Sequence, residues 1–176
     1  GATDIVVVSL SGALSATIQS AELAAREVAD AVRVHVVDSR SVTLGLGTMV
    51  LAAAEAAEAG DDAESIVAAV TDMAARTRVI GALDTLENLR KGGRIGGAKA
   101  LLATALSIKP IIEVIDGVVE QAGKQRTRSR TLAFIVDKVA AAADRVEGLA
   151  VLPASCPAVA DFGARLRAAS PPFGDI

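Results

Sequence analysis

Two short apolar runs lie on either side of a helical pattern in the first part of the chain. Ile5–Val8 and Val34–Val37 are continuous and rich in β-branched residues, which is typical of strands buried in a parallel sheet. Between them a Ser/Gly-rich loop leads into a helical stretch, for which we predict an N-cap at Ser15 or Thr17 and an end near Ala31. This order predicts a parallel βαβ unit.

Two more helices are predicted before the pattern changes. An Ala-rich stretch runs up to Gly60, which we expect to be its C-cap. Asp62–Arg76 then has Ile66, Val70 and Met73 at helical spacing, so one face of this helix should be buried. Strand, helix, strand and helix in succession indicate helices packed on a parallel sheet.

The remainder of the chain has a mixed pattern. Val79–Leu83 is a predicted strand, and Asp116-Gly117 between two apolar runs is typical of a tight hairpin turn. The other expected elements are a short helix Thr85–Lys91, a helix Gly97–Ser107, hairpin strands Ile111–Ile115 and Val118–Ala122, a helix Thr131–Val146, a strand Leu149–Leu152 and a last helix with Pro157 near its start. We therefore predict an α/β protein with two lobes: a parallel βαβ N-terminal lobe in residues 1–78 and a mixed α/β C-terminal lobe with a β-hairpin in residues 79–176.

Composition and charge exclude several classes of function. The chain is 52% hydrophobic and 22% charged, as in ordinary globular proteins. Its net charge of -3 and a pI near 5.2 argue against nucleic-acid binding, and its apolar runs are too short for membrane insertion. A single cysteine, Cys156, indicates a reducing compartment, hence the cytoplasm, and a single histidine, His35, argues against a transition-metal site.

Motifs for nucleotides and nucleophiles are incomplete. Gly45-Leu46-Gly47 follows a predicted strand, but Val50 stands where a dinucleotide fingerprint has its third glycine, so close helix packing explains these glycines better. Gly123-Lys124 lacks the spacing of a P-loop, and no Gly-x-Ser-x-Gly elbow occurs. The sequence thus predicts no catalytic residues and no metal or organic cofactor.

A hydroxyl-rich cluster precedes the first predicted helix. It runs as Ser9-x-Ser11-Gly12-x-x-Ser15-Ala16-Thr17. Free backbone N–H groups, the helix dipole and Ser/Thr hydroxyls together suit an anion such as a carboxylate. The alternative is plain N-capping.

A second cluster is basic and glycine-rich. It consists of 91–97, Lys-Gly-Gly-Arg-Ile-Gly-Gly, followed by Lys124 and Arg126 on the hairpin. Arg94 on a glycine-rich loop can approach a phosphate through two N–H donors. The alternative is a solvated basic strand beside a flexible turn.

These two clusters, in this order and with the hairpin between Arg94 and Arg126, resemble the DegV family of fatty-acid-binding proteins. The matching segments extend over nearly the whole chain. They are Leu14-Ser15-Ala16-Thr17-Ile18-Gln19-Ser20-Ala21, Val36-Val37-Asp38-Ser39, Gly45-Leu46-Gly47, Asp84-Thr85-Leu86, Leu89-x-Lys91-Gly92-Gly93-Arg94-Ile95, Ile108-Lys109-Pro110-Ile111 and Lys124-x-Arg126-Thr127.

The resemblance implies a protein that buries a long-chain fatty acid between two lobes and presents its carboxylate to a separate fatty acid kinase subunit. It implies that Ser15, Ala16 and Thr17 hold the carboxylate, Ala16 standing where the family has Gly and Ile18 where it has Tyr. It also implies that Arg94 and Arg126 face the phosphate or the kinase. The family's N-terminal Ser/Thr-rich loop and its C-terminal Gly- and His-containing segment are not found, so we expect both lobes to be incomplete.

Two other functions stay open at this point. One is a stand-alone α/β enzyme for a small molecule or for phosphoryl transfer, in which Asp38 and Asp84 at strand ends would bind magnesium or act as bases. The other is a protein that docks partners without binding any ligand.

Overall fold

The chain divides into two compact units. The computed structural model describes residues 2–103, 108–152 and 159–169. The first unit comprises Gly1–Val79 and Glu113–Glu120, and the second comprises Ile80–Ile112 and Gln121–Ile176. That residues 1–78 and 79–176 form two separate lobes stays a prediction. In the structure the tip of the hairpin, Glu113–Glu120, belongs to the first unit.

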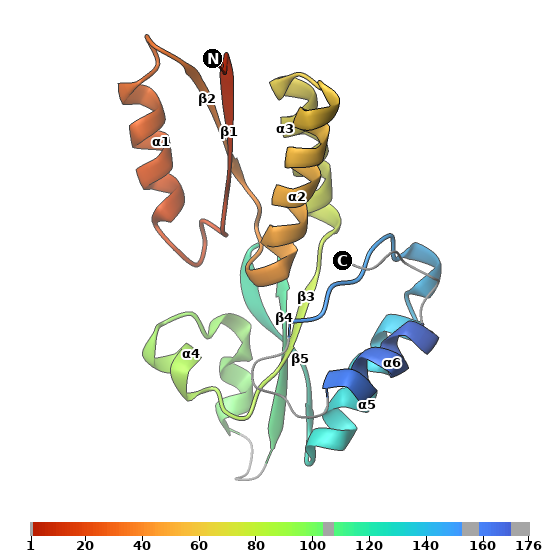
Figure 1. The fold of residues 1–176 in the computed structure, drawn as a ribbon. Helices are drawn as coiled ribbons and strands as arrows, with labels where there is room; N and C mark the ends of the chain where they lie inside the picture. The colour runs from red at the N-terminus through yellow and green to blue at the C-terminus, as the bar shows by residue number, and fades with distance from the viewer. Residues whose placement is uncertain (1, 104–107, 153–158, 170–176) are drawn as a thin grey trace. The chain divides into compact units, whose positions relative to one another are not determined.

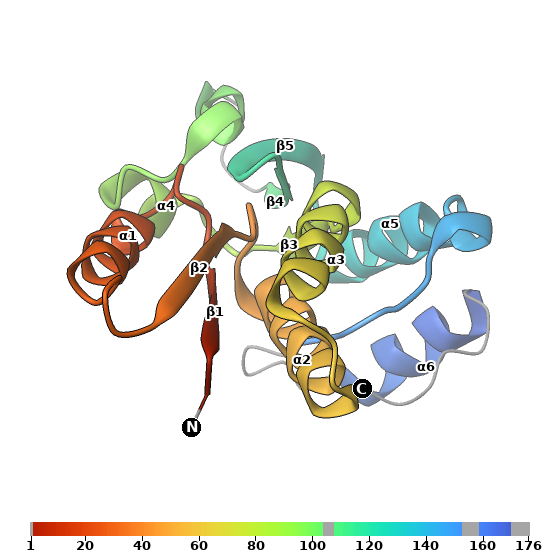
Figure 2. The same ribbon diagram turned by 90° about the horizontal axis from the view of Figure 1, so that it is seen from above.

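A parallel two-stranded sheet forms the centre of the first unit. Its strands are β1 (Asp4–Ser9) and β2 (Arg33–Asp38), and its helices are α1 (Thr17–Glu27), α2 (Thr43–Ala59) and α3 (Ala63–Arg76). The register pairs Asp4 with Arg33 and Ser9 with Asp38, so the two strands end side by side. In both views α1 covers one face of the sheet while α2 and α3 cover the other (Figures 1 and 2). The predicted parallel βαβ unit is confirmed.

The core of this unit lies between the sheet and its two later helices. It consists of Val37, Met49, Ile66, Val70 and Ala74, all at most 9% exposed. Of the three residues predicted for the buried face of α3, Ile66 and Val70 are buried, and Met73 is half-buried and packs against the same core. Gly60 ends α2 in the left-handed conformation, with φ at 94°, as predicted for the C-cap.

The second unit is built on the sheet β3–β4–β5. Its elements are β3 (Val79–Ala82), α4 (Glu87–Lys91), the 3₁₀ helix η1 (Gly96–Ala103), β4 (Lys109–Ile115), β5 (Val118–Gln125), α5 (Arg128–Ala140), the 3₁₀ helix η2 (Ala143–Arg145) and α6 (Val159–Ala169). Asp116 and Gly117 both have positive φ, at 50° and 83°, as a type I′ hairpin turn requires. The predicted hairpin is confirmed, and both of its strands are longer than predicted.

Four predicted elements differ from the structure. Residues 149–152 form no strand. Helix α1 ends at Glu27 and not near Ala31, because the residues expected in its last turn form tight turns instead; in one of them the Ala31 N–H donates to the Val28 carbonyl. The expected helix from Gly97 is a 3₁₀ helix that begins at a pair of glycines. Helix α5 begins three residues early because the Thr127 side chain caps it, and it ends at Ala140. Pro157 and Cys156 lie outside the described residues.

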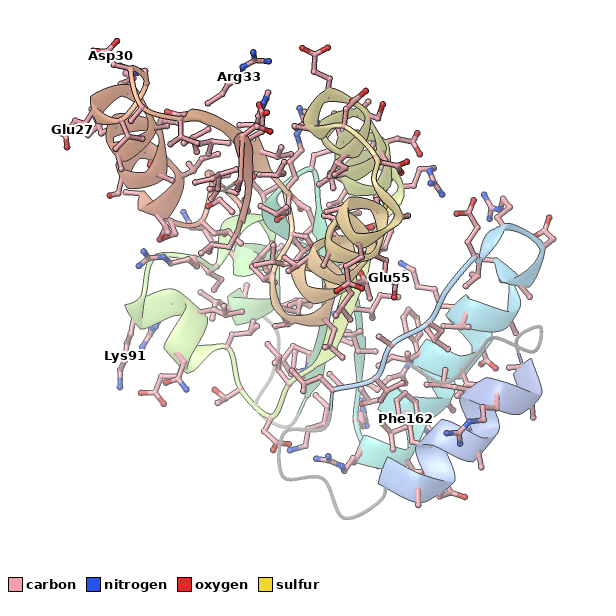
Figure 3. All side chains as sticks on the ribbon, turned by 45° about the horizontal axis from the view of Figure 1, so that its top comes forward. Glu27, Asp30, Arg33, Glu55, Lys91 and Phe162 are labelled. Atoms are coloured by element: carbon pink, nitrogen blue, oxygen red, sulfur yellow. The ribbon has the colours of Figure 1, made fainter. Side chains whose placement is uncertain are left out.

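The surface of both units carries most of the charged side chains. Glu27 and Asp30 project outward at the C-terminal end of α1, and Lys91 projects from the end of α4 (Figure 3). Among the described residues, no helix is both long and apolar enough to cross a bilayer.

Candidate functional site

Ser15, Ala16 and Thr17 lie together at the N-terminus of α1. The hydroxyl oxygens of Ser15 and Thr17 are 2.8 Å apart, and the Thr17 N–H donates to Ser15 Oγ at 3.3 Å. Ala16 is the N-cap residue and makes no side-chain cap hydrogen bond, so the prediction that Ser15 or Thr17 caps the helix is wrong. The reason is register: Ser15 precedes the cap position by one residue, and its hydroxyl reaches only the first helical N–H.

This helix end has the properties of an anion site. The N–H groups of a first helical turn have no acceptor within the helix, and here the side chain of the cap residue, Ala16, supplies none. The Thr17 N–H is bonded to Ser15 Oγ, which belongs to the same predicted site. The first turn contains no acidic residue that would oppose an anion. Ala16 and Thr17 are exposed and Ser15 is half-buried, so a ligand can reach all three. Ile18, only 8% exposed, anchors the helix just behind them.

The loop before α1, residues 10–16, is held by the neighbouring strand. Both carboxylate oxygens of Asp38 accept the Gly12 N–H, at 3.2 Å each, and Asp38 Oδ1 also accepts the Arg40 N–H at 2.8 Å. The Ser11 N–H donates to the Ser41 carbonyl at 2.9 Å. This β1–α1 loop is therefore fastened both to the end of β2 and to the β2–α2 loop, residues 39–42.

Four buried serines lie at these strand ends. They are Ser9, Ser11, Ser39 and Ser41, each at most 6% exposed. Ser39 Oγ donates to the Ser41 carbonyl and accepts the Ser41 N–H, which makes a closed local turn. Ser41 Oγ has no hydrogen-bond partner among the described residues. The hydroxyl-rich cluster of the sequence includes Ser9 and Ser11 but not Ser41, whose hydroxyl lies against Gly45 of α2 and belongs to no motif.

Arg94 and Arg126 belong to the second unit. Arg94 follows α4, is exposed, and donates from Nη1 to the Gly92 carbonyl at 2.6 Å. Arg126 is exposed and follows directly after β5. Both stand on the surface of their unit, and they come from different elements. Ser15–Thr17 belong to the first unit.

The two aspartates considered for an enzyme have other partners. Asp38 is occupied by two backbone N–H groups, and Asp84 accepts a hydrogen bond from Lys109 Nζ at 2.8 Å. The Lys109 ammonium lowers the pKa of Asp84 below its ordinary value. Within the described ranges no three His, Cys, Asp or Glu side chains come together as a metal site would need.

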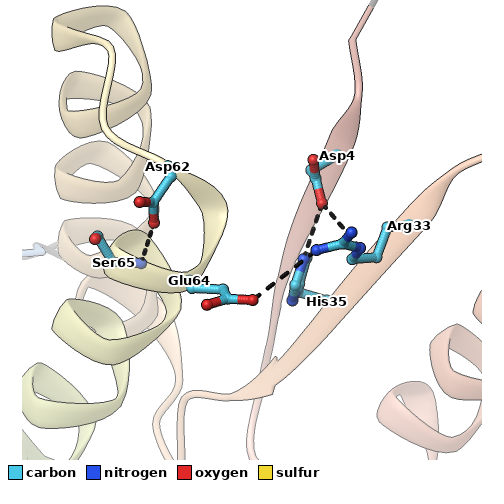
Figure 4. A network of polar contacts seen from close by, with 6 residues as sticks. All are labelled: Asp4, Arg33, His35, Asp62, Glu64 and Ser65. Atoms are coloured by element: carbon cyan, nitrogen blue, oxygen red, sulfur yellow. Dashed lines mark hydrogen bonds and ion pairs between the residues drawn. The ribbon is translucent and has the colours of Figure 1, made fainter.

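A polar network lies at the opposite ends of the first two strands. His35 Nε2 and Asp4 Oδ1 are 3.2 Å apart, and Arg33 is close to both Asp4 and Glu64 (Figure 4). The hydrogen bond to His35 lowers the pKa of Asp4. His35 is thus paired within the sheet, as expected of a structural strand residue.

A cavity of about 330 Å³ lies between β2 and α3. Its walls are mainly aliphatic, and Asp38 and Arg40 line it as well. Its one hydroxyl, from Thr71, donates to the Val67 carbonyl at 2.7 Å. Ser15, Ala16 and Thr17, the residues predicted to hold an anion, do not line this cavity.

Taken together, these features define an α/β protein of two units in which loops at the carboxyl ends of parallel strands lead to an uncapped helix N-terminus. The chain belongs to the DegV family. The profile of that family, described as "Uncharacterised protein, DegV family", matches residues 1–168. The resemblance noted from the sequence motifs is confirmed.

Individual relatives support this membership. A DegV domain-containing protein of Mycobacterium bovis is 42% identical over 162 residues, which are 92% of this chain and 57% of that protein. The DegV family protein from Thermus thermophilus, whose structure was solved for its fatty acid binding, shares 40% of its sequence with this chain. The two structures match with a TM-score of 0.76 over 82% of this chain and 51% of that one.

A third relative was solved with a ligand. The DegV family protein of Eubacterium eligens, loaded with heptadecanoic acid, is 27% identical with a TM-score of 0.70 and covers 80% of this chain and 52% of that one. The chain therefore spans between about half and three-fifths of the length of these three relatives.

Proposed function

We propose that this protein binds a long-chain fatty acid and holds its carboxylate at Ser15, Ala16 and Thr17. The observation that carries the proposal is the N-terminus of α1, which has two paired hydroxyls, no side-chain cap and no acidic residue. The relatives from Thermus thermophilus and Eubacterium eligens, described as binding a fatty acid and as loaded with heptadecanoic acid, support the ligand class.

The physical balance favours a long chain over a short one. Burial of each methylene contributes about 0.8 kcal/mol, so the apolar tail supplies most of the affinity. The carboxylate must lose water, and this costs free energy unless hydrogen bonds replace the water. Backbone N–H groups and hydroxyls at a helix start supply such bonds, each contributing about 1.5–3 kcal/mol when the acceptor is charged.

We further propose that the bound carboxylate is presented to a separate kinase subunit, and that the protein performs no catalysis alone. Arg94 and Arg126 are exposed cations in the second unit, suited to the phosphate or to the surface of that subunit. The single cysteine of the chain agrees with a cytoplasmic place of action. Both aspartates of the alternative enzyme are engaged within the chain, Asp38 by the N–H groups of Gly12 and Arg40 and Asp84 by Lys109, which favours a structural role for them over magnesium binding.

The first experiment is extraction of the purified protein with solvent, followed by mass spectrometry, on this chain and on any longer form of the protein. Titration with a fluorescent C16 fatty acid then compares Ser15→Ala with Ser20→Ala, an exposed serine one turn further along α1. We expect Ser15→Ala to weaken binding about ten- to a hundredfold and Ser20→Ala to leave it unchanged. Equal affinities would remove Ser15 from the site.

A second experiment addresses the kinase. With the kinase subunit, ATP and a fatty acid present, Arg94→Ala and Arg126→Ala should slow phosphorylation of the fatty acid while leaving its affinity unchanged. Arg90→Ala, an exposed arginine on α4, is the control. Phosphorylation without any added kinase would contradict the binding role and favour the stand-alone enzyme.

A further inference from the structure

The tip of the hairpin contacts the β1–α1 loop directly. Ser11 Oγ donates to the Gly117 carbonyl at 2.6 Å, across 106 positions of the chain. Ser11 is fully buried, with 0% of its surface exposed. A methyl group added at Gly117 would lie 2.7 Å from Ser11 Oγ, so the turn approaches this hydroxyl as closely as a glycine permits. Both residues belong to the first unit.

Ser11 is also the point from which the loop is organised. Its carbonyl accepts the N–H groups of Leu14 and Ser15, both at 3.1 Å, and its hydroxyl accepts the Ala13 N–H at 3.2 Å. One hydrogen bond therefore links the backbone of Ser11 to that of Ser15, which is the residue proposed to hold the carboxylate. The Ser11 N–H donates to the Ser41 carbonyl at 2.9 Å, so every polar atom of Ser11 takes part in a hydrogen bond.

We propose that Ser11 is a positioning residue of the carboxylate site and that the hairpin tip is the anchor that holds it. Because Ser11 has no exposed surface, it acts on the ligand only through the loop that it orders. The hydroxyl joins the tip to the loop, and the Ser11 carbonyl passes this constraint to the N-terminus of α1. The effect of Ser11 on ligand binding rests on the proposed fatty-acid site, whereas the ordering of the β1–α1 loop by Ser11 does not.

A matched pair of serines separates this role from a general loss of packing. Ser9 is also buried, at 6% exposure, but its hydroxyl donates only to the carbonyl of the next residue, Leu10, at 3.2 Å. Ser9→Ala and Ser11→Ala thus remove the same atom from two buried sites, one at the end of β1 and one in the β1–α1 loop. Only the second substitution breaks a contact with the hairpin.

The first readout is amide hydrogen exchange in the ligand-free protein. We expect Ser11→Ala to speed the exchange of the amides of residues 13–19 about tenfold, and Ser9→Ala to leave them at the wild-type rate. Ser11→Cys, which keeps a weak donor of similar size, should give an intermediate rate. Equal exchange in Ser11→Ala and Ser9→Ala would overturn the proposal.

The second readout is affinity for the fluorescent C16 fatty acid. We expect Ser11→Ala to bind about tenfold more weakly than Ser9→Ala, with the Ser15 hydroxyl still in place. Wild-type affinity in Ser11→Ala would overturn the role of Ser11 while leaving the proposed function intact. A wild-type protein that binds no fatty acid would instead contradict the proposed function, and amide exchange would still decide whether Ser11 orders the loop.

A second variant applies if Ser11→Ala does not fold. Gly117→Ala pushes a methyl group against Ser11 Oγ, whereas Gly60→Ala adds one at a similar positive φ with no atom within 4 Å. Faster exchange at residues 13–19 in Gly117→Ala alone supports the anchor. The same rates in both variants would count against it.

Discussion

The carboxylate of Asp38 accepts the backbone N–H of Gly12 through both of its oxygens, at 3.2 Å each. Asp38 is the last residue of β2, and Gly12 lies in the loop that follows its neighbour β1. The parallel register, which pairs Ser9 with Asp38, brings the two together. A methyl group on Gly12 would lie 3.0 Å from Asp38 Oδ2, a tight contact, so glycine at this position lets the loop lie against the carboxylate without any shift of the side chain.

We predict that Asp38→Ala lowers the free energy of unfolding by about 1.5–3 kcal/mol, since it leaves the N–H groups of Gly12 and Arg40 without their charged acceptor. Denaturant unfolding monitored by circular dichroism measures this change. Asp30→Ala, at an exposed position after α1, is the control and should change stability by less than about 0.5 kcal/mol. An effect of Asp38→Ala no larger than that of the control would show that the loop does not depend on this carboxylate.

Two glycines of α2 should respond to alanine in opposite directions. At Gly45 a methyl group would lie 2.2 Å from Ser41 Oγ and 2.6 Å from Val79 Cγ2, so Gly45→Ala should cost about 1–3 kcal/mol through overpacking. At Gly47 the nearest atom, Leu44 Cδ2, is 3.7 Å away, so Gly47→Ala should gain about 0.5–1 kcal/mol from helix propensity. Thermal unfolding of both variants tests the pair, and stabilisation by both would contradict the packing at Gly45.

The start of α3 depends on a side-chain cap. Asp62 Oδ1 accepts the Ser65 N–H at 2.7 Å, so Asp62→Ala should lower the free energy of unfolding by about 0.5–2 kcal/mol. Asp61→Ala is the neighbouring control, because Asp61 is exposed and is not the cap residue. Urea unfolding distinguishes the two, and equal losses would argue that net charge rather than capping is responsible.

Acid should weaken the network around Asp4. Hydrogen bonding to His35, with smaller contributions from a hydrogen bond to Thr3 and from the Arg33 charge, holds the pKa of Asp4 below its ordinary value of 3.8 in the folded chain. A carboxylate with a lowered folded pKa stabilises the protein above the unfolded pKa, and this stability is lost as the pH falls through the folded pKa. Asp4→Asn should therefore be less stable than wild type at pH 7, and the difference should shrink below about pH 4.

Thermal unfolding of wild type and Asp4→Asn at several pH values measures this effect. Asp30→Asn, at an exposed position after α1, should track the wild type throughout. A difference that stayed constant between pH 7 and pH 3 would mean that Asp4 acts through its shape rather than its charge.

Local chemistry explains which features could be predicted from the sequence. The turn at Asp116-Gly117 and the C-cap at Gly60 need a positive φ, which glycine adopts without steric cost and aspartate tolerates better than most residues. The buried face of α3 follows from helical spacing alone. The placement of Ser15–Thr17 at a helix start was also predicted, because hydroxyl residues before an amphipathic stretch indicate that boundary.

Features that depend on distant partners were not predicted. Helix α1 begins at Thr17, which makes Ala16 the N-cap residue, and the pattern of apolar and polar residues does not locate a helix start to within one residue. The expected strand at 149–152 has an apolar sequence but joins neither of the two sheets that the described residues form. The contact of Ser11 with Gly117 joins a predicted loop to a predicted turn, yet neither motif specifies the other.

The span of that contact also has a consequence for the order of assembly during synthesis. Residues 1–79 emerge from the ribosome first and can already form β1, β2 and the helices that cover them. Ser11, however, has no acceptor for its hydroxyl until Gly117 has been made. The bonds of the loop to Asp38 and Ser41 can form early, whereas its anchor on the hairpin tip requires every element between Ser11 and Gly117 to have been translated, so this anchor is the last of the loop's contacts to form.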